Sequence, residues 1–293
     1  MRAATEDAEP PSRFVDATGA AGRDDIAGLL AAARADPDGP SSLAALAERA
    51  HFSRFHLSRM LRNHLGFSFR EFVAALKVQR GIDVLVEGHE VIRSQTESGH
   101  ESASSYHHSF LQHTGLAPKR YRDQQRFLAS FLLRHMADRT PRTATCRCFA
   151  AEEHEQPHAL TIEVTGAAPG SAVFVALNPT VILKGRPTLG IALMHLAECV
   201  VASIPDGDYF AMVVEAPASA GVQGLFQLDQ NRRQLRRQPI TFPLAAPTRV
   251  TLALRDLDPA DPPITPNLPH LFFVAVTGRV DVQERNSRQV PRQ

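Results

Sequence analysis

The hydrophobic period of this 293-residue chain changes once, near residue 145, and this change limits the folds that the chain can adopt. Before it, apolar residues recur at three- and four-residue intervals, which is typical of amphipathic helices. After it, runs of five to nine residues alternate between apolar and polar and are separated by Pro, Gly and Asp turns, which indicates strands. The chain is therefore predicted to have two domains, all-α and then all-β.

The helical half contains two short amphipathic helices with a tight break between them, in the stretch SLAALAERAHFSRFHLSRMLRNHLG from Ser42 to Gly66. Ser53 follows the break and is placed to cap the second helix. This arrangement predicts a helix-turn-helix, although an ordinary helix pair with a solvated outer face is the alternative. The second helix presents polar donors suited to base edges and phosphates, namely Arg54, His56, Ser58, Arg59, Arg62 and Asn63.

The rest of the helical half repeats this unit weakly. A helix is predicted over 24–35, before the motif, and a long one over 68–86, where Ser68 and Glu71 form a capping-box pattern. Shorter helices follow over 91–95 and 102–113, with a turn between them, and a last helix runs to about His135. Two such modules one duplex turn apart would meet successive major grooves.

Residues from about 24 to 123 resemble the DNA-binding domain of the AraC/XylS family of transcription regulators. The resemblance is carried by LAALAERAHFSRFHLSRMLRNHLGFSFREF, RGIDVLVEG and GLAPKRYR. It implies about seven helices, two helix-turn-helix modules and binding to double-stranded promoter DNA. By position, it puts the base-reading residues of the first module at Phe55, Ser58 and Arg59, and those of the second at Ala103, Ser104, Ser105 and His108. We expect Arg59 to read guanine, and phosphates to be held by Arg54, Arg62, Lys119 and Arg122.

The second module departs from the family pattern. Ser94, Gln95 and His100 stand where the family usually has an Ile-Ala pair and an aromatic residue. Each substitution would place a polar group in a core, where an unpaired group costs about 1–3 kcal/mol. We therefore expect a second module that is loosely folded or that contributes little base readout.

The second half predicts an antiparallel β-sandwich. Its predicted strands are Ala159–Gly166, Ser171–Asn178, Asp208–Ala216, Val222–Leu228, Arg249–Leu254 and Leu271–Val276. The stretches GSAVFVALNPTVILKGRPTLG and SIPDGDYFAMVVEA are similar to the sandwich domain of actinomycete AraC-type regulators, and IPDGDY resembles the prealbumin/carboxypeptidase-regulatory type. This resemblance leaves open whether the sandwich senses a ligand, forms dimers or contacts another protein.

The predicted organisation is a disordered tail over 1–22, a DNA-binding domain over 23–138, a linker over 139–157, the sandwich over 158–278 and a second tail over 279–293. The formal net charge is only +1, so a nucleic-acid footprint must be local. Arg232–Arg237 form a basic run, which we interpret as a solvated hairpin tip rather than a phosphate contact.

The sequence offers little for catalysis, and we predict neither an enzyme nor a bound cofactor or metal. It contains no nucleophile-elbow, phosphate-loop or zinc-protease motif. The pair Cys146 and Cys148 supplies only half of a tetrahedral site. The cluster Glu152, Glu153, His154, Glu155 and His158 is interpreted as a solvated surface. No apolar run reaches membrane-spanning length, and the amino terminus lacks the features of a signal peptide, so a cytoplasmic location is expected.

The main hypothesis is a sequence-specific transcription regulator whose first module reads the major groove. The expected partners are promoter DNA, RNA polymerase, a small-molecule effector and a second copy of the chain. The alternative is a ligand-sensing or protein-interaction adaptor in which a degenerate second module has weakened DNA binding.

Overall fold

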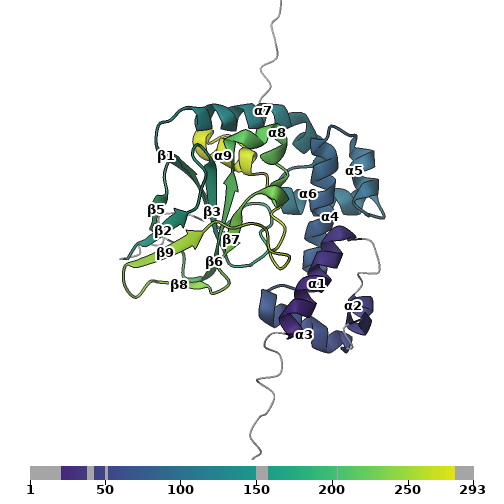
Figure 1. The fold of residues 1–293 in the computed structure, drawn as a ribbon. Coiled ribbons are helices and arrows are strands. Elements are labelled where there is room, and N and C mark those ends of the chain that lie inside the picture. The colour runs from purple at the N-terminus through teal and green to yellow at the C-terminus, as the bar shows by residue number, and fades with distance from the viewer. Residues whose placement is uncertain (1–20, 38–42, 50–51, 150–157, 203, 281–293) are drawn as a thin grey trace, which may run out of the picture.

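The computed structural model describes residues 21–37, 43–49, 52–149, 158–202 and 204–280. Helices form the first part of the chain and two sheets dominate the second, as the change of period predicts (Figure 1). The helices of the first part are α1 (Ala21–Ala35), α2 (Leu43–Arg49), α3 (Arg54–Leu65), α4 (Phe69–Val86), α5 (Val91–Glu97), α6 (Ala103–Thr114) and α7 (Pro118–Ala137). We call α2 with α3 the first module and α5 with α6 the second.

The two modules are delimited by the same local signals. Helix α3 follows Ser53, whose side chain accepts a hydrogen bond from the His56 amide, and it ends at Gly66 with φ 76°. Helix α6 follows Ser102, which accepts from the Ser105 amide, and it ends at a glycine with φ 81°. A left-handed residue closes a helix at least cost when it has no Cβ. Both helices have 12 residues, so the predicted duplication holds in detail.

Helix α4 joins the modules and is the central strut of the helical part. Its capping box forms as predicted, because the Ser68 side chain accepts from the Glu71 amide while the Glu71 carboxylate accepts from the Ser68 amide. The 18 residues of α4 correspond to about 27 Å. Apolar side chains such as Phe72, Ile82 and Leu85 are buried along it. Both modules therefore pack against one rigid element.

The second part is a sandwich of two sheets. Its strands are β1 (Arg142–Arg147), β2 (Leu160–Thr165), β3 (Ala172–Asn178), β4 (Leu189–Met194), β5 (Glu198–Val201), β6 (Gly207–Ala216), β7 (Arg233–Leu235), β8 (Ile240–Phe242) and β9 (Thr248–Ala253). The larger sheet has the order β1-β4-β3-β6-β7, with β8 against β6, and the smaller has the order β5-β2-β9. All pairings are antiparallel except β2 with β9. The core between the sheets includes Ile162, Val175, Leu193, Val213 and Leu252.

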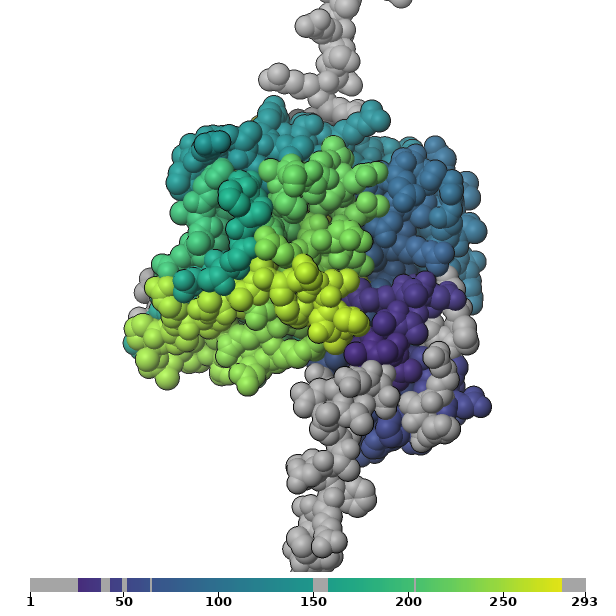
Figure 2. Space-filling view, viewed as in Figure 1, coloured from purple at the N-terminus to yellow at the C-terminus, as the bar shows by residue number. Residues whose placement is uncertain are grey.

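The outer face of the larger sheet belongs to the same apolar core as the helices. Phe174, Met212 and Val214 on this face join one buried cluster with Phe72 of α4 and Leu128 of α7. Helix α9 (Leu268–Thr277) contacts both β1 and α7, and α7 passes over this side of the sheet (Figure 1). Figure 2 shows the helical and sheet parts in contact along the face in view. The two parts are therefore fused by a shared core.

Two predicted strands are wrong. Residues 222–228 form helical turns, including α8 (Gly221–Gly224), and residues 271–276 lie in α9. Helix α9 begins where Asn267 accepts a hydrogen bond from the His270 amide, and Pro269 lies in its first turn. A short apolar run such as 271–276 fits a buried helix as well as a strand. The sequence signals that favour the helix are the cap at Asn267 and the proline at 269.

The predicted linker is also wrong in part, because residues 142–147 form β1 and pair with β4. An edge strand of this sheet thus follows α7 almost directly. The predicted tails over 1–20 and 281–293, and residues 150–157 of the predicted linker, lie outside the described residues.

The basic run 232–237 is not a solvated hairpin tip. Arg233 in β7 is 2% exposed and lies 3.6 Å from the Asp229 carboxylate. Arg34 of α1 reaches the same carboxylate at 3.5 Å and also donates to the carbonyl oxygen of Asp261. The partly buried contacts of Arg34 hold α1 against the sheet part. The prediction of a solvated tip failed because it took charge as a sign of exposure, whereas Arg233 is buried and pairs with Asp229 four residues before it.

Candidate nucleic-acid interface

Helix α3 separates its side chains cleanly into a core face and an outer face. Leu57, Leu61 and Leu65 are at most 5% exposed and pack in the shared core. Of the predicted interface residues, Arg54, Phe55, His56, Arg59 and Arg62 are exposed, and Ser58 is half-buried. The sequence therefore predicted correctly which face of α3 is open.

The exposed face of α3 has two features suited to a ligand. Phe55 is 80% exposed, the highest value among the large apolar side chains that the structure describes. Within the described residues, the side chains of Arg54 and Arg59 form neither a hydrogen bond nor an ion pair. An apolar ring flanked by unpaired guanidinium groups can contact a thymine methyl group, a guanine edge and phosphates.

Helix α6 presents a different surface on the same frame. Ala103, Ser104, Ser105 and His108 are exposed, as predicted. The exposed Leu111, 41% accessible, occupies the position that corresponds to Arg62 when the two capped helices are superposed residue by residue. The outer face of α6 carries no lysine or arginine, so its long-range attraction for phosphate is weak.

The two predicted phosphate-binding residues at the start of α7 differ in their availability. Lys119 is exposed. Arg122 forms ion pairs with Glu90 and Asp123, and the hydrogen bond to Glu90 raises the pKa of its guanidinium. The Glu90 side chain is 80% exposed, and exposed pairs are worth only about 0–1 kcal/mol. Arg122 can therefore exchange its carboxylate partner for a phosphate at little cost.

Two of the three polar residues that depart from the family pattern in the second module, Ser94 and His100, have hydrogen-bond partners, and the third, Gln95, is only half-buried. The fully buried Ser94 donates to the Gly81 carbonyl oxygen at 2.7 Å and shares a hydrogen bond with the Tyr106 hydroxyl. His100 is bonded through Nδ1 to the Ser98 hydroxyl at 2.9 Å and packs edge-on against Tyr106. The expectation of a loosely folded second module is wrong, because satisfied buried groups do not carry the penalty on which it rested.

The sheet part holds the C-terminal ends of both recognition helices, α3 and α6. At the end of α3, a Cβ added to Gly66 would lie 2.8 Å from Val181, and Arg237 donates to the Leu65 carbonyl oxygen. At the end of α6, the Gly185 amide donates to the His113 carbonyl oxygen at 2.8 Å. The N-terminal ends of both helices, which carry the predicted base-reading residues, remain exposed.

Two more contacts fix the end of α6. The buried His113 ring shares a hydrogen bond from Nδ1 to the Thr265 hydroxyl at 3.1 Å, and the Asn267 amide donates to the Thr114 carbonyl oxygen at 3.2 Å. Burial lowers the pKa of His113 to about 4, and the nearby Lys184 adds to the fall. The ring is therefore neutral near pH 7.

Asp83 of α4, which is half-buried, is a second titratable group beside the second module. Burial raises its pKa to about 7, and the Asp229 carboxylate adds to the rise. Gln79 donates to Asp83 at 3.2 Å, which offsets part of the cost of the charge. The interface between the strut and the sheet part thus contains an acid that titrates near neutral pH.

The described residues contain no group of three His, Cys, Asp or Glu side chains placed to hold a metal ion. Cys146, Cys148 and Cys199, all within the described ranges, are free thiols. Of the acidic and histidine cluster discussed above, Glu152, Glu153, His154 and Glu155 lie outside the described residues. A bilayer-crossing helix, with the length and apolar character that this requires, is absent from the described part of the chain.

A family model of a helix-turn-helix domain matches residues 46–124, a range that runs from within α2 into α7 and includes both modules. Residues 46–124 are therefore similar to helix-turn-helix domains. The AraC type and the sandwich type both remain predictions from the sequence. No curated protein matches the chain.

Solved structures match about a third of the chain. A DNA-binding transcriptional dual regulator from Escherichia coli is 21% identical, with a TM-score of 0.30, and the match covers 33% of this chain and 86% of that one. The C-terminal domain of the response regulator yesN from Fusobacterium nucleatum is 19% identical, with a TM-score of 0.31 and coverages of 34% and 97%. The C-terminal domain of AraT, a response regulator from Geobacillus stearothermophilus, is 20% identical, with a TM-score of 0.30 and coverages of 35% and 83%.

The contacts at the ends of α3 and α6 were missed from the sequence. Val181, Gly185 and Thr265 lie far along the chain from the helices that they touch, and His113 and Thr265 are 152 positions apart. No local sequence pattern predicts such contacts, because each of these residues is of a type that is common in turns and at strand ends. Only the shared core brings them to the helix-turn-helix domain.

Proposed function

We propose that this chain is a sequence-specific DNA-binding transcription regulator in which α3 enters a major groove and reads bases. The observation that supports this most directly is the exposed outer face of α3, on which Arg54 and Arg59 have no partner among the described residues, within the range matched by the helix-turn-helix model. Helix-turn-helix proteins place the N-terminal residues of the recognition helix against base edges. In α3 these residues are exposed, and the sheet part contacts the opposite end of the helix.

The residues of α3 divide by chemistry into readers and anchors. Arg59 would pair with the O6 and N7 atoms of guanine, a contact worth about 1–3 kcal/mol of discrimination. Phe55 would cover a thymine methyl group, and His56 and Ser58 would bond to neighbouring polar atoms. Arg54 and Arg62 would hold phosphates, which adds affinity without sequence preference.

The second module would contribute orientation more than attraction. Ala103, Ser104, Ser105 and His108 are small or weakly charged, so they can approach a groove closely but gain little from the field of the phosphates. Lys119 and, once released from Glu90, Arg122 would anchor this side of the domain. The reading lobe is therefore the first module.

The test is selection of bound sequences from a random DNA pool by the full chain, followed by a salt series on the selected site. Arg59→Ala should bring the affinities for selected and random DNA together, with a loss of about 1–3 kcal/mol of discrimination. Arg62→Ala should weaken binding to both DNAs equally and reduce the salt slope by about 0.9. Arg139→Ala, at an exposed arginine beyond the end of α7, is the matched control and should change neither.

The outcomes separate the parts of the proposal. If Arg59→Ala weakens binding to selected and random DNA equally, the assignment of Arg59 as a base reader is wrong. If no sequence is enriched and no salt-dependent binding occurs, the regulator proposal fails as a whole. The adaptor reading, with its activity in the sheet part, would then replace it.

A further inference from the structure

Two segments of the sheet part each contact the C-terminal ends of both α3 and α6. The first is residues 181–185, which we call the first bridge. Val181 packs against the end of α3, where a Cβ added to Gly66 would lie 2.8 Å from its side chain. Four residues later, the Gly185 amide donates to the His113 carbonyl oxygen of α6 at 2.8 Å. Since four residue steps span at most about 14 Å, the first bridge joins the two helix ends over a short path.

The second bridge is Arg237 together with residues 260–265. The Arg237 guanidinium donates to the Leu65 carbonyl oxygen of α3 at 3.3 Å and to the Ala260 carbonyl oxygen at 3.0 Å. From Ala260 the chain runs on to Thr265, whose hydroxyl shares a hydrogen bond with the buried histidine ring at the end of α6. One side chain from the segment between β7 and β8 thus links the end of α3 to the segment that holds the end of α6.

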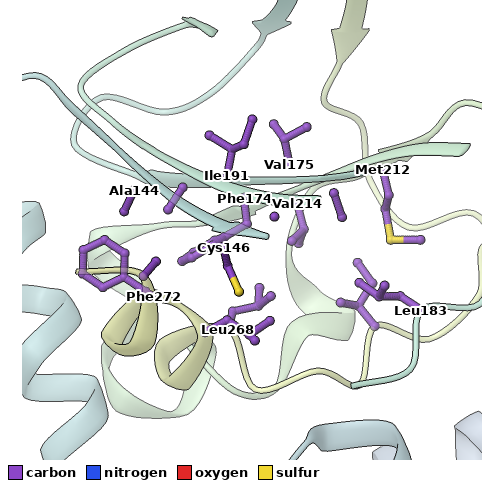
Figure 3. A pocket seen from close by; sticks show the side chains of 16 residues that line it. Ala144, Cys146, Phe174, Val175, Leu183, Ile191, Met212, Val214, Leu268 and Phe272 are labelled. Carbon is purple, nitrogen blue, oxygen red and sulfur yellow. The ribbon is translucent and has the colours of Figure 1, made fainter. Parts of the chain in front are cut away.

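Both bridges are anchored on the sheet part. Leu183, in the middle of the first bridge, is buried and lines the same small apolar pocket as Met212 of β6 (Figure 3). In the second bridge, Ile264 is buried, and the Arg255 guanidinium donates to both carboxylate oxygens of Asp261, at 2.7 and 2.8 Å. Such a bidentate pair fixes the geometry of its partners. The helix ends are therefore held by segments that have fixed places of their own.

The orientation of a recognition helix at its C-terminal end decides where its base-reading end lies. Each of the two helices has 12 residues and is about 18 Å long, so a tilt of about 10° about the C-terminal end moves the N-terminal residues by about 3 Å. One base pair along the duplex corresponds to about 3.4 Å. A tilt of this size therefore changes the half-site spacing that α3 and α6 fit by about one base pair.

We propose that the two bridges set the separation and angle of α3 and α6, so that the chain discriminates between DNA sites by the spacing of the half-sites that the two helices read, and that Arg237 is a positioning residue for this discrimination. Arg237 acts through the end of α3 and does not contact DNA in this role. The constraint adds to the packing of both modules on α4. Discrimination by spacing rests on the proposed DNA-binding function, whereas the positioning of the two helices does not.

The chain offers a matched control for a change in each bridge. Gly66→Ala drives a methyl group against the first bridge, whereas Gly115→Ala puts the same strained left-handed alanine at the end of α6, where the added Cβ meets nothing within 4 Å. Arg237→Ala removes both hydrogen bonds of the second bridge. Arg236→Ala removes the neighbouring guanidinium, which donates to the Gln238 carbonyl oxygen in the same loop. Each control thus carries the same backbone strain or the same loss of charge as its test variant.

The first measurement is made without DNA. Spin labels at Asn63→Cys of α3 and Gln112→Cys of α6, both exposed positions, report the distance between the helices in the full chain, with the exposed thiol removed by Cys148→Ser. Pulsed electron paramagnetic resonance should give one narrow distance distribution in the labelled parent and in both controls. Gly66→Ala should shift or broaden the distribution, and Arg237→Ala should broaden it.

The second measurement uses the selected DNA site and copies of it in which the two half-sites are one base pair closer or farther apart. The unmodified chain should bind these copies several-fold more weakly than the selected site. Arg237→Ala should lose most of this preference, so that the three affinities come together, while Arg236→Ala should keep it. Affinity for a single half-site should be the same in both variants, because neither changes the outer face of α3.

The outcomes are distinguishable. If Gly66→Ala and Arg237→Ala match their controls in both measurements, the inference is overturned and the proposed function stands. A broadened distance with an unchanged spacing preference, or a selected site with a single half-site, would overturn the role in spacing and leave the positioning in place. Absence of any DNA binding by the unmodified chain would refute the proposed function, and the spacing role with it, while the distances would still decide whether the bridges position the helices.

Discussion

The first and second modules have the same helix geometry but carry different side chains on their outer faces. Helices α3 and α6 have the same length, a serine at the start and a left-handed glycine at the end. Yet α3 carries Phe55 and exposed arginines, whereas α6 carries alanine, serines and histidines. The caps and the core positions therefore specify the helix, and the outer positions are free to differ. A duplicated unit can keep its geometry while its two copies take unequal shares of binding.

The modules also differ in how their cores are held together. Phe67 stacks on Phe72 beside the first module at 5.6 Å between ring centroids. In the second module, Ser94 and Tyr106 meet through a buried hydrogen bond. Apolar packing tolerates small shifts, but a buried hydrogen bond fixes its partners in place and is costly to break on one side.

The largest effects we expect come from the two titratable groups beside the second module. The pKa of Asp83 is raised to about 7, so the folded state binds its proton more tightly than the unfolded state does. The contribution of Asp83 to the free energy of unfolding therefore rises as pH falls from about 7 toward 4. His113, with a pKa lowered to about 4, destabilises it over nearly the same range, because the unfolded state binds the proton more tightly. Each is worth roughly 3–4 kcal/mol at full effect, and in the native chain they oppose each other.

Single substitutions should separate the two opposing contributions when the free energy of unfolding is measured in urea at several pH values. Asp83→Asn removes the acid, so its free energy of unfolding should exceed that of the native chain at pH 8 and fall as pH drops from about 6.5 to 4. His113→Gln should show the reverse slope, rising as pH drops. A flat profile in Asp83→Asn would contradict the assignment for His113.

The next effect concerns the buried hydrogen bond of the second module. Ser94→Ala leaves the Tyr106 hydroxyl without its partner and should cost about 1–3 kcal/mol of stability. Adding Tyr106→Phe removes the orphaned hydroxyl and should recover most of that loss. Thermal or urea unfolding of the two singles and the double variant gives the coupling energy. Additive losses would mean that the bond does not hold the module.

Adding an arginine to the outer face of α6 tests whether that face lies against DNA. Leu111→Arg places on α6 the residue type that Arg62 supplies on α3, at an exposed position where the change does not disturb the core. It should add one phosphate contact and steepen the salt slope on two-site DNA by about 0.9. The slope on a single half-site bound by α3 should not change. An unchanged slope on both DNAs would place α6 away from the duplex.

The smallest effect is expected at Glu90. Glu90→Gln removes the charge that pairs with Arg122 and, since the pair is exposed, should change stability by less than about 1 kcal/mol. It should raise affinity for two-site DNA slightly by freeing Arg122 for phosphate. Arg93→Ala disrupts the nearby exposed pair with Glu97 without freeing a cation and serves as the control. A loss of affinity in Glu90→Gln would show that Glu90 positions Arg122.

The sequence predicted the elements whose signals are local. The caps at Ser53 and Ser68, the glycine ends and the exposed face of α3 all follow from a few neighbouring residues. The failures share a different cause. Leu271–Val276 was predicted as a strand because a short buried run has no period of its own, and Arg233 was predicted to be exposed because its acidic partners are distant or belong to another element.

The sequence pattern predicted the helical part and the sheet part but not the core that they share. The change of period is real, but it says nothing about which faces the two parts share. Phe174 and Val214 alternate as ordinary sheet residues, and only the fold shows that they pack with the helices. The exposed face of α3 was predictable from the sequence. The contacts by which the sheet part holds the C-terminal ends of α3 and α6 were not.

The shared core also has a consequence for how the chain is made. A ribosome delivers the helical part first, and the cover for Leu128, Leu132 and the inner side of α7 arrives only with the strands and α9. At about 5–20 residues per second, the roughly 140 residues from the end of α7 to the end of α9 take on the order of 10 s. During that interval the apolar side of the nascent helices is exposed to solvent. We therefore expect chaperones to bind a truncated or stalled chain and proteases to cleave it early.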